Sequence, residues 1–235
     1  MATVAEKKPV VMVGITVDGK PLSVKKDSFL LKSLIDNRIP VPTLCHHKDL
    51  TPNGTCRLCL VEVEIRGKKR FVTACNYPVR DAMNVATRSP GVLQHRKVLA
   101  EMYLARWPNV QVVKDIAKIC GVTETRYKSE YADLNPKACI LCGHCVKACK
   151  EFMQEEILDF AGRGIKRHLT MPFGEMDRHC VGCTSCAHVC PTGAIEVKDD
   201  FNHPHDHKMI RDVGMKVNAE MATLDKGQCC MREVG

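Results

Sequence analysis

The sequence contains few aromatic residues: they make up 5% of its 235 residues, and there is a single tryptophan. It has no run of eighteen apolar residues, so we expect no direct membrane span. Residues 1–9 are polar and lack the apolar segment of a secretory signal, which favours a cytoplasmic protein. Hydrophobic residues still make up 45% of the chain, and with so few aromatics they predict small modules rather than one large core.

Motifs that bind nucleotides are also missing. The chain has neither G-x-G-x-x-G after a strand pattern nor G-x-x-x-x-G-K followed by Ser or Thr. No nucleophile–base pair and no paired carboxylates stand out, so we expect no catalytic residues. The net charge is +8, yet no tight run of Lys and Arg is interleaved with aromatics, so we expect no nucleic-acid partner.

Cysteine, by contrast, is abundant, with 15 residues. Eight of these cysteines form two copies of one pattern, C-x2-C-x2-C-x3-C, and Pro191 follows the second copy. Three thiolates two residues apart can surround one 4Fe-4S cluster, while the fourth lies on a turn that faces away and ligates the cluster of the other copy. The pattern therefore predicts two exchanged ligand sets: Cys139, Cys142, Cys145 and Cys190 for one cluster, and Cys180, Cys183, Cys186 and Cys149 for the other.

Two other cysteine chemistries compete with this interpretation. Structural zinc sites normally pair two short Cys or His elements across a longer loop, and not four cysteines in one run. A secreted disulphide scaffold would need an export signal, whereas clustered cysteines in a cytosolic protein more often bind metal. We therefore favour iron–sulphur clusters over both.

A second constellation precedes the repeat, with the spacing C-x10-C-x2-C-x15-C. Plant-type ferredoxins also place three cysteines in one loop and the fourth after a hairpin, around a 2Fe-2S cluster, but their first gap has four residues. A loop widened by about six residues can still reach the same cluster. We expect His46 and His47 to be loop residues, because four cysteines are already present. The predicted 2Fe-2S ligands are Cys45, Cys56, Cys59 and Cys75.

Local patterns predict an α+β fold. Alternation of apolar residues predicts strands at 11–17, 22–25, 61–65, 71–74 and 83–87, with turns at Asp18-Gly19 and Gly67-Lys68. Helical patterns follow three expected caps, namely Asp27 or Ser28, Ser89 and Asn109; Val92, Leu99 and Met102 would share one face of the second helix. Cys120 lies on the apolar face of the third, where core packing is expected.

These patterns divide the chain into four parts. We expect a β-grasp-like 2Fe-2S ferredoxin domain at 1–88, a helical linker at 89–137 and a bacterial ferredoxin-like domain with two 4Fe-4S clusters at 138–198. The tail at 199–235 contains a His-rich stretch, and also Cys229 and Cys230. Its polar composition favours an extended segment that packs on a partner.

The run from about residue 10 to 198 resembles the small iron–sulphur subunit of NAD-linked soluble hydrogenases and related dehydrogenases. That subunit is similar to the N-terminal part of the large iron–sulphur subunit of respiratory complex I. The resemblance lies in Pro42-Thr-Leu-Cys45, in Gly54-Thr-Cys56-Arg-Leu-Cys59, in Cys75 and in the two four-cysteine runs. Many family members have a further His-plus-three-Cys cluster after the helix at 90–106, which this chain lacks because no cysteine precedes Cys120 there.

The resemblance implies a non-catalytic electron-transfer subunit with two partners: a flavoprotein that handles NADH and a separate catalytic subunit. Electron-bifurcating hydrogenases, formate dehydrogenases and some acyl-CoA reductases of anaerobes use such modules. The alternative is the iron–sulphur subunit of a succinate dehydrogenase or fumarate reductase. That subunit has a first gap of about four residues and a three-iron centre that lacks one ligand, whereas all the four-cysteine sets here are complete.

The three ligand sets predict the metal content of the protein. Anaerobically reconstituted protein should bind about ten irons per chain, from one 2Fe-2S and two 4Fe-4S clusters, and should absorb broadly in the visible range. Iron and acid-labile sulphide analysis checks this number. A colourless protein with stoichiometric zinc would contradict it.

Overall fold

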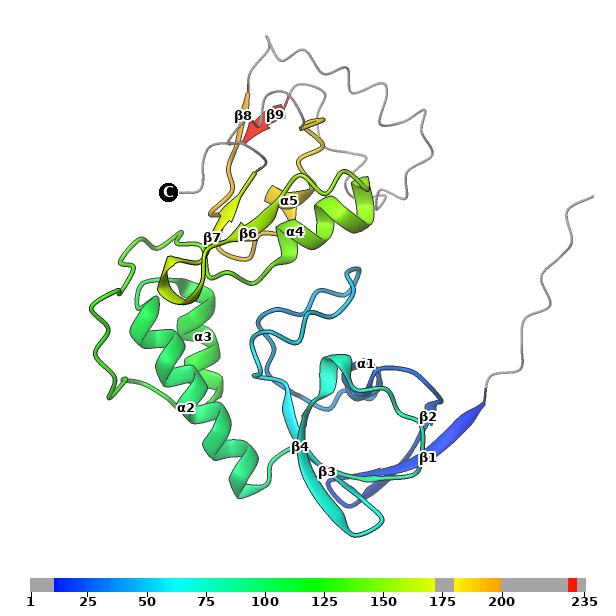
Figure 1. Cartoon of the computed structure of the whole chain (residues 1–235). Helices are drawn as coiled ribbons and strands as arrows, with labels where there is room; N and C mark the ends of the chain where they lie inside the picture. The colour runs from blue at the N-terminus through cyan, green and yellow to red at the C-terminus, as the bar shows by residue number, and fades with distance from the viewer. Residues whose placement is uncertain (1–10, 172–179, 200–227, 232–235) are drawn as a thin grey trace, which may run out of the picture.

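The computed structural model describes residues 11–171, 180–199 and 228–231. An N-terminal sheet with one short helix is followed by a pair of helices and then by the unit that contains the cysteine repeat (Figure 1). Among the described residues, no helix is both long enough and apolar enough to cross a membrane.

The N-terminal unit is built on a mixed five-stranded sheet with the order β2-β1-β5-β3-β4. β5 runs parallel to β1 and antiparallel to β3, as expected for a β-grasp-like fold. Both hairpins turn through two residues with positive φ, Asp18-Gly19 and Arg66-Gly67, which is typical of type I′ turns, so the second turn lies one residue earlier than predicted. The strands are β1 (Met12–Val17), β2 (Lys20–Lys25), β3 (Leu60–Ile65), β4 (Lys68–Thr73) and β5 (Asn84–Ala86).

Helix α1 (Leu30–Asp36) packs on this sheet through Leu30, Leu31 and Leu34, which are fully buried. Its predicted cap is wrong. Phe29 occupies the N-cap position without a side-chain hydrogen bond, and the Ser28 hydroxyl donates instead to the Lys25 carbonyl at 2.5 Å. A short 3-10 helix, Ala74–Asn76, follows β4 and carries Cys75.

Helices α2 (Pro90–Arg106) and α3 (Gln111–Ile119) form the linker. Ser89 caps α2 as predicted, accepting a hydrogen bond from the Val92 N–H at 3.4 Å. The predicted apolar face is partly wrong, because Met102 is 54% exposed whereas Arg96 is buried. Asn109 does not cap α3, since its amide donates to the Leu134 carbonyl at 2.8 Å. Gly121 ends α3 with φ +71°, a left-handed conformation that favours glycine.

The third unit wraps short elements around the cysteine repeat. α4 (His144–Ala148) continues into a π-helix (Cys149–Met153), and β6 (Asp159–Ala161) pairs with β7 (His168–Thr170) around a 3-10 turn, Gly164–Lys166. α5 (Ser185–His188) belongs to the second copy of the repeat. β8 (Val197–Asp199) pairs with β9 (Gln228–Met231), which contains Cys229 and Cys230. The packing of the tail on a partner stays a prediction.

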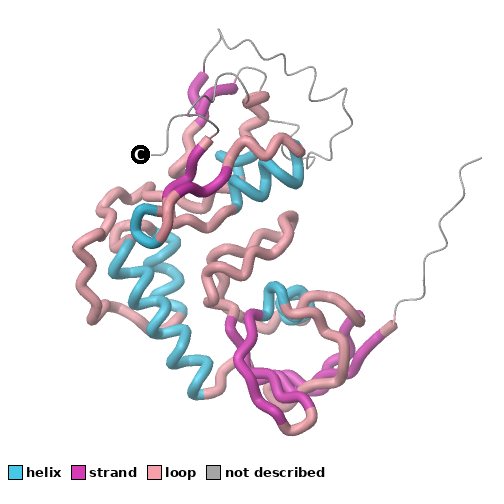
Figure 2. The backbone as a smooth tube through the Cα atoms, in the orientation of Figure 1, coloured by secondary structure: helices cyan, strands magenta, loops and turns pink. Residues whose placement is uncertain are grey.

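The linker joins the outer units through one shared core. Trp107, Val110 and Val113 from the linker are buried together with Cys45 and Ile140, which come from the loops of the first and third units. The helix pair therefore supports both sets of cysteine loops at once. Figure 2 shows the two helices beside the loops that extend from each unit.

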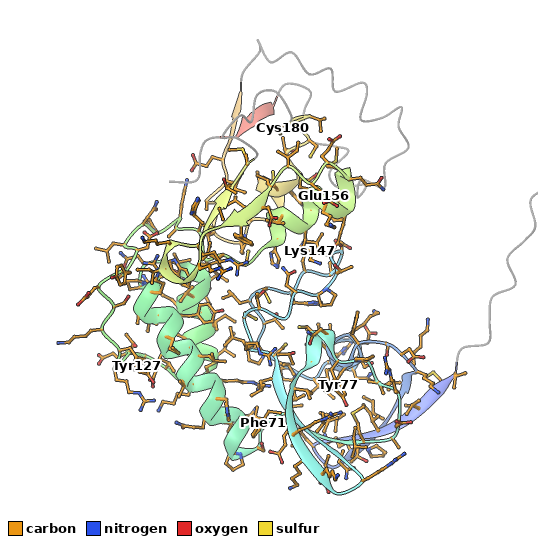
Figure 3. All side chains as sticks on the ribbon, in the orientation of Figure 1. Phe71, Tyr77, Tyr127, Lys147, Glu156 and Cys180 are labelled. Carbon is orange, nitrogen blue, oxygen red and sulfur yellow. The ribbon has the colours of Figure 1, made fainter. Side chains whose placement is uncertain are left out.

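The wide loop between Cys45 and Cys56 extends from the sheet toward α4 (Figure 1). Leu50 at its tip is buried against Ala148 and Val189 of the third unit. The Thr51 N–H donates to Glu151 Oε2 at 2.8 Å, its hydroxyl donates to Oε1 of the same carboxylate, and Lys147 Nζ donates to that hydroxyl at 2.6 Å. Lys147 lies on α4, on the side that faces this loop (Figure 3). We call residues 46–55 the bridging loop.

Glu151 is the central acceptor of this contact. Burial alone would raise the pKa of its carboxyl, but hydrogen bonds from Thr51 and Lys147 outweigh burial and lower the pKa. A lowered pKa means that the contact stabilises the fold fully above the unfolded value of about 4 and is lost as the pH falls below it.

This contact gives a testable prediction for the bridging loop. Replacing Glu151→Gln should expose the Thr51 amide to faster hydrogen exchange, by about tenfold to a hundredfold, because hydrogen bonds to charged groups contribute about 1.5–3 kcal/mol. Hydrogen exchange of the iron-loaded protein, read by mass spectrometry on the peptide that contains Thr51, measures it. Glu130→Gln, at an exposed position of the linker, is the control. Equal exchange in both variants would show that the carboxylate does not hold the loop.

Candidate metal centres

The first group of cysteines lies at the end of the N-terminal sheet where β3 begins and β4 finishes. Cys45 belongs to the loop before the bridging loop, Cys56 and Cys59 lead into β3, and Cys75 follows β4. All four are buried. The structure therefore brings together the four residues that the sequence predicts as one ligand set.

The thiols of this first group interact in pairs. A hydrogen bond from the Cys56 thiol, with further donation from the backbone of Cys56 and Thr55, lowers the pKa of Cys45 to about 5 despite burial. In the second pair, a hydrogen bond from the Cys75 thiol lowers the pKa of Cys59 to about 7. The pKa values of Cys56 and Cys75 are raised in turn, because each thiol donates to an anionic sulphur. Cys45 and Cys59 are thus the more acidic thiols of this group, and thiolates suit the cationic iron–sulphur core of a cluster.

The second group draws on both copies of the repeat. Burial is the main cause that raises the pKa of Cys142 and Cys145 to about 12, and the charge of Cys190 contributes to both shifts. The pKa of Cys139 is raised as well, mainly by burial and in part by the charge of Cys190. Cys190 therefore lies with the three cysteines of the first copy, although it belongs to the second.

The third group shows the reciprocal exchange. A single hollow is lined by Cys149 of the first copy together with Cys180, Cys183 and Cys186 of the second. Met153, Ile157 and Leu158 supply apolar walls to the same hollow. The structure thus gathers the cysteines into the two exchanged sets that the spacing predicts; that they bind clusters stays a prediction.

The backbone of both copies is shaped to surround an anionic centre. Leu141 and Gly143 have positive φ in the first copy, and Gly182 and Thr184 have positive φ at the equivalent positions of the second. Alternation of right- and left-handed residues turns successive N–H groups inward, a geometry found at many iron–sulphur sites. The Gly182 N–H donates to Cys180 Sγ at 3.4 Å. These loops fit a cluster whose cysteines bind different iron atoms.

Backbone N–H groups also surround the sulphur of Cys190. Burial would raise the pKa of its thiol, but the backbone N–H groups of Ile195, Thr192 and Ala194 outweigh burial and lower it.

Metal binding requires thiolates and releases protons, so the buried Cys142 and Cys145 depend on a bound cation to remain ionised. In the described part of the chain, no three His, Cys, Asp or Glu side chains converge on a single ion.

The first and second groups are neighbours. Cys142 packs against the core that contains Cys45 and Cys56, and the charge of Cys45 raises the pKa of Cys142. Asn53 of the bridging loop donates to the Cys142 carbonyl at 3.3 Å. Gly143 has φ +81°, a left-handed conformation that favours glycine, and a Cβ atom there would lie 2.8 Å from the Asn53 amide nitrogen.

The sequence did not indicate that histidines meet at this contact. His144 is buried, and its ring lies 5.7 Å from that of His47 in an edge-on arrangement. Burial lowers the pKa of His46 and His47 and keeps their rings neutral. Both belong to the bridging loop, as expected, and the charges of Cys45 and His144 act on the pKa of His46. Cys120 packs partly buried in the linker core, as predicted.

Comparison with known proteins assigns both cysteine-bearing units. Residues 11–90 match the family model described as "2Fe-2S iron-sulfur cluster binding domain", and residues 132–197 match "4Fe-4S dicluster domain". The chain is an iron–sulphur protein with a 2Fe-2S domain and a 4Fe-4S dicluster domain. This result confirms the α+β fold class and the predicted order of the two domains.

Relatives of this iron–sulphur protein include subunits of oxidoreductases and of a hydrogenase. The chain is 32% identical to the NADPH-Fe(3+) oxidoreductase subunit alpha of Geobacter sulfurreducens over 78% of its own length and 24% of the relative's. It is also 32% identical to the NADP-reducing hydrogenase subunit HndD of Solidesulfovibrio fructosivorans, over 78% of its own length and 36% of the relative's. The NADH-ubiquinone oxidoreductase 75 kDa subunit of Reclinomonas americana is 29% identical to it, over 80% of this chain and 30% of the relative.

These relatives confirm the predicted resemblance to hydrogenase and complex I iron–sulphur subunits, although the chain spans only about a quarter to a third of their length. A chain of the NAD+-reducing [NiFe]-hydrogenase has the same fold, with a TM-score of 0.65 over 77% of this chain and 85% of that one. The sequence identity to it is 24%, so this comparison supports the fold alone.

The exchanged sets predict which centre a single substitution damages. Cys149→Ser should perturb the centre of Cys180, Cys183 and Cys186, because Cys149 lines their hollow. EPR spectra of the reduced, iron-loaded variant should lose or alter one 4Fe-4S signal, and Cys190→Ser should alter the other. The same signal changing in both variants would contradict the exchange.

Proposed function

We propose that this chain is the electron-transfer subunit of a multi-subunit NAD(P)-linked oxidoreductase. It would take single electrons from a flavoprotein partner that handles NADH or NADPH and deliver them to a separate catalytic subunit. When bound, one 2Fe-2S and two 4Fe-4S clusters supply the one-electron carriers. Twelve cysteines in the three groups described above would hold them.

The contact between the first two cysteine groups is the observation that carries this proposal. Cys45 and Cys142 share one core, and the bridging loop holds the two units together at Leu50, Thr51 and Asn53. A chain that only stored metal would not need its groups side by side. A relay does, because electron transfer weakens steeply with distance.

The linker supports the same interpretation. Trp107 is buried in the shared core, and the Tyr103 ring stacks on it with a centroid distance of 5.8 Å. These rings exclude water between the first two groups. Burial raises the pKa of the Tyr103 hydroxyl, so it stays neutral there. The family's further His-plus-three-Cys cluster has no ligands here, and packed side chains occupy the linker instead.

The names of the relatives favour a nicotinamide-linked complex. NADPH, NADP and NADH each appear in the name of one of the three relatives reported above. Hydride transfer delivers two electrons together, so a flavin is needed to divide them before single-electron carriers can accept them. Because the chain has no dinucleotide motif, we assign the flavin to the partner.

This proposal predicts that the isolated, iron-loaded chain does not oxidise NADH or NADPH. The test mixes the chain with each nucleotide and an artificial one-electron acceptor, with and without its co-purified flavoprotein. Reduction of the acceptor should appear only in the mixture that contains the flavoprotein. Turnover by the chain alone would reveal a nucleotide or flavin site in it and would refute the relay.

A further inference from the structure

One buried cation lies beside the first cysteine group. Arg96 on α2 is 5% exposed, and its Nη2 donates to the carbonyl of Leu60, the residue after Cys59, at 2.6 Å. Its buried Nε has no hydrogen-bond partner among the described residues. A buried guanidinium is costly unless an anion compensates it.

The nearby carboxylates bind other groups and form no ion pair with Arg96. Asp18 accepts hydrogen bonds from the Thr87 N–H at 2.7 Å and from its hydroxyl at 2.6 Å. Glu62 accepts from Ser89 and pairs with Lys69. Within residues 11–171 and 180–199, no ion pair joins Arg96 to Asp or Glu.

Cysteine sulphur acts on Arg96 more strongly than these carboxylates, although the charge of Asp18 also opposes the lowering of the Arg96 pKa. Burial lowers the pKa of Arg96, and the charges of Cys120 and Cys59 are the first influences that oppose this change. Arginine nevertheless stays protonated in proteins. Cys120 is itself a partly buried thiol with a raised pKa, so it is protonated at neutral pH. Of these two cysteines, only Cys59 belongs to a predicted ligand set.

We propose that Arg96 is the fixed counter-charge of the first cysteine group and raises the reduction potential of the 2Fe-2S centre. The inference rests on the proposed function, because it assumes that Cys45, Cys56, Cys59 and Cys75 hold that centre. The oxidised centre with its four thiolates is anionic, and each electron that it accepts adds one negative charge. A permanent cation beside Cys59 therefore favours the reduced state. Arg96 is a positioning residue: it tunes the centre and does not ligate it.

The experiment is an EPR-monitored redox titration of the iron-loaded protein with dithionite as the electron donor. Arg96→Gln retains a donor toward the Leu60 carbonyl but removes the charge. It should lower the midpoint potential by at least about 59 mV, which is a tenfold shift in a one-electron equilibrium. Arg96→Lys should restore most of the wild-type value. Lys97→Gln, the next residue and exposed, removes one charge at the surface and should leave the midpoint unchanged.

The outcomes separate this inference from the proposed function. An intact 2Fe-2S signal with an unchanged midpoint in Arg96→Gln would overturn the counter-charge while leaving the ligand set standing. Absence of a 2Fe-2S signal from the wild-type protein would overturn both. If Arg96→Gln does not retain its centre, Arg96→Met supplies a second neutral variant. The midpoint shift should persist at high salt, because buried charges are screened little.

Discussion

The need to keep buried sulphur ionised governs this structure. Burial raises the pKa of Cys142 and Cys145 to about 12, so these residues are thiols at neutral pH unless a cation binds them. A bound metal centre thus contributes its binding free energy to folding, since the unfolded chain holds no preformed site. The small cores around the repeat are consistent with a unit that depends on its metal for stability.

The second constraint is the distance between units. Two ferredoxin-like units joined by a flexible linker would place their centres at no fixed separation. Here the bridging loop packs Leu50 against the third unit, and Trp107 and Val113 of the linker are buried in one core with Cys45. The lengthened gap between Cys45 and Cys56 therefore has a structural role: its extra residues make the contact with the neighbouring unit.

The sequence was sufficient for features that depend on local residues or on the repeated cysteine spacing. Spacing alone indicated the exchanged positions of Cys149 and Cys190, and Ser89-Pro90 indicated the start of α2. Tertiary contacts decided the rest: Asn109 bonds to Leu134 rather than capping α3, and Thr51 meets a carboxylate a hundred residues away. The left-handed Leu141 and Thr184 were not expected, because each copy shows glycine at only one of its two left-handed positions.

We expect each 4Fe-4S centre to take ligands from both copies of the repeat. Anomalous diffraction at the iron edge, from anaerobically grown crystals of the iron-loaded protein, would locate each centre. It should reveal three separate iron centres, with Cys190 at the centre of Cys139, Cys142 and Cys145, and Cys149 at the centre of Cys180, Cys183 and Cys186. Cys149 bound to the same centre as Cys139, or zinc in place of iron, would contradict it.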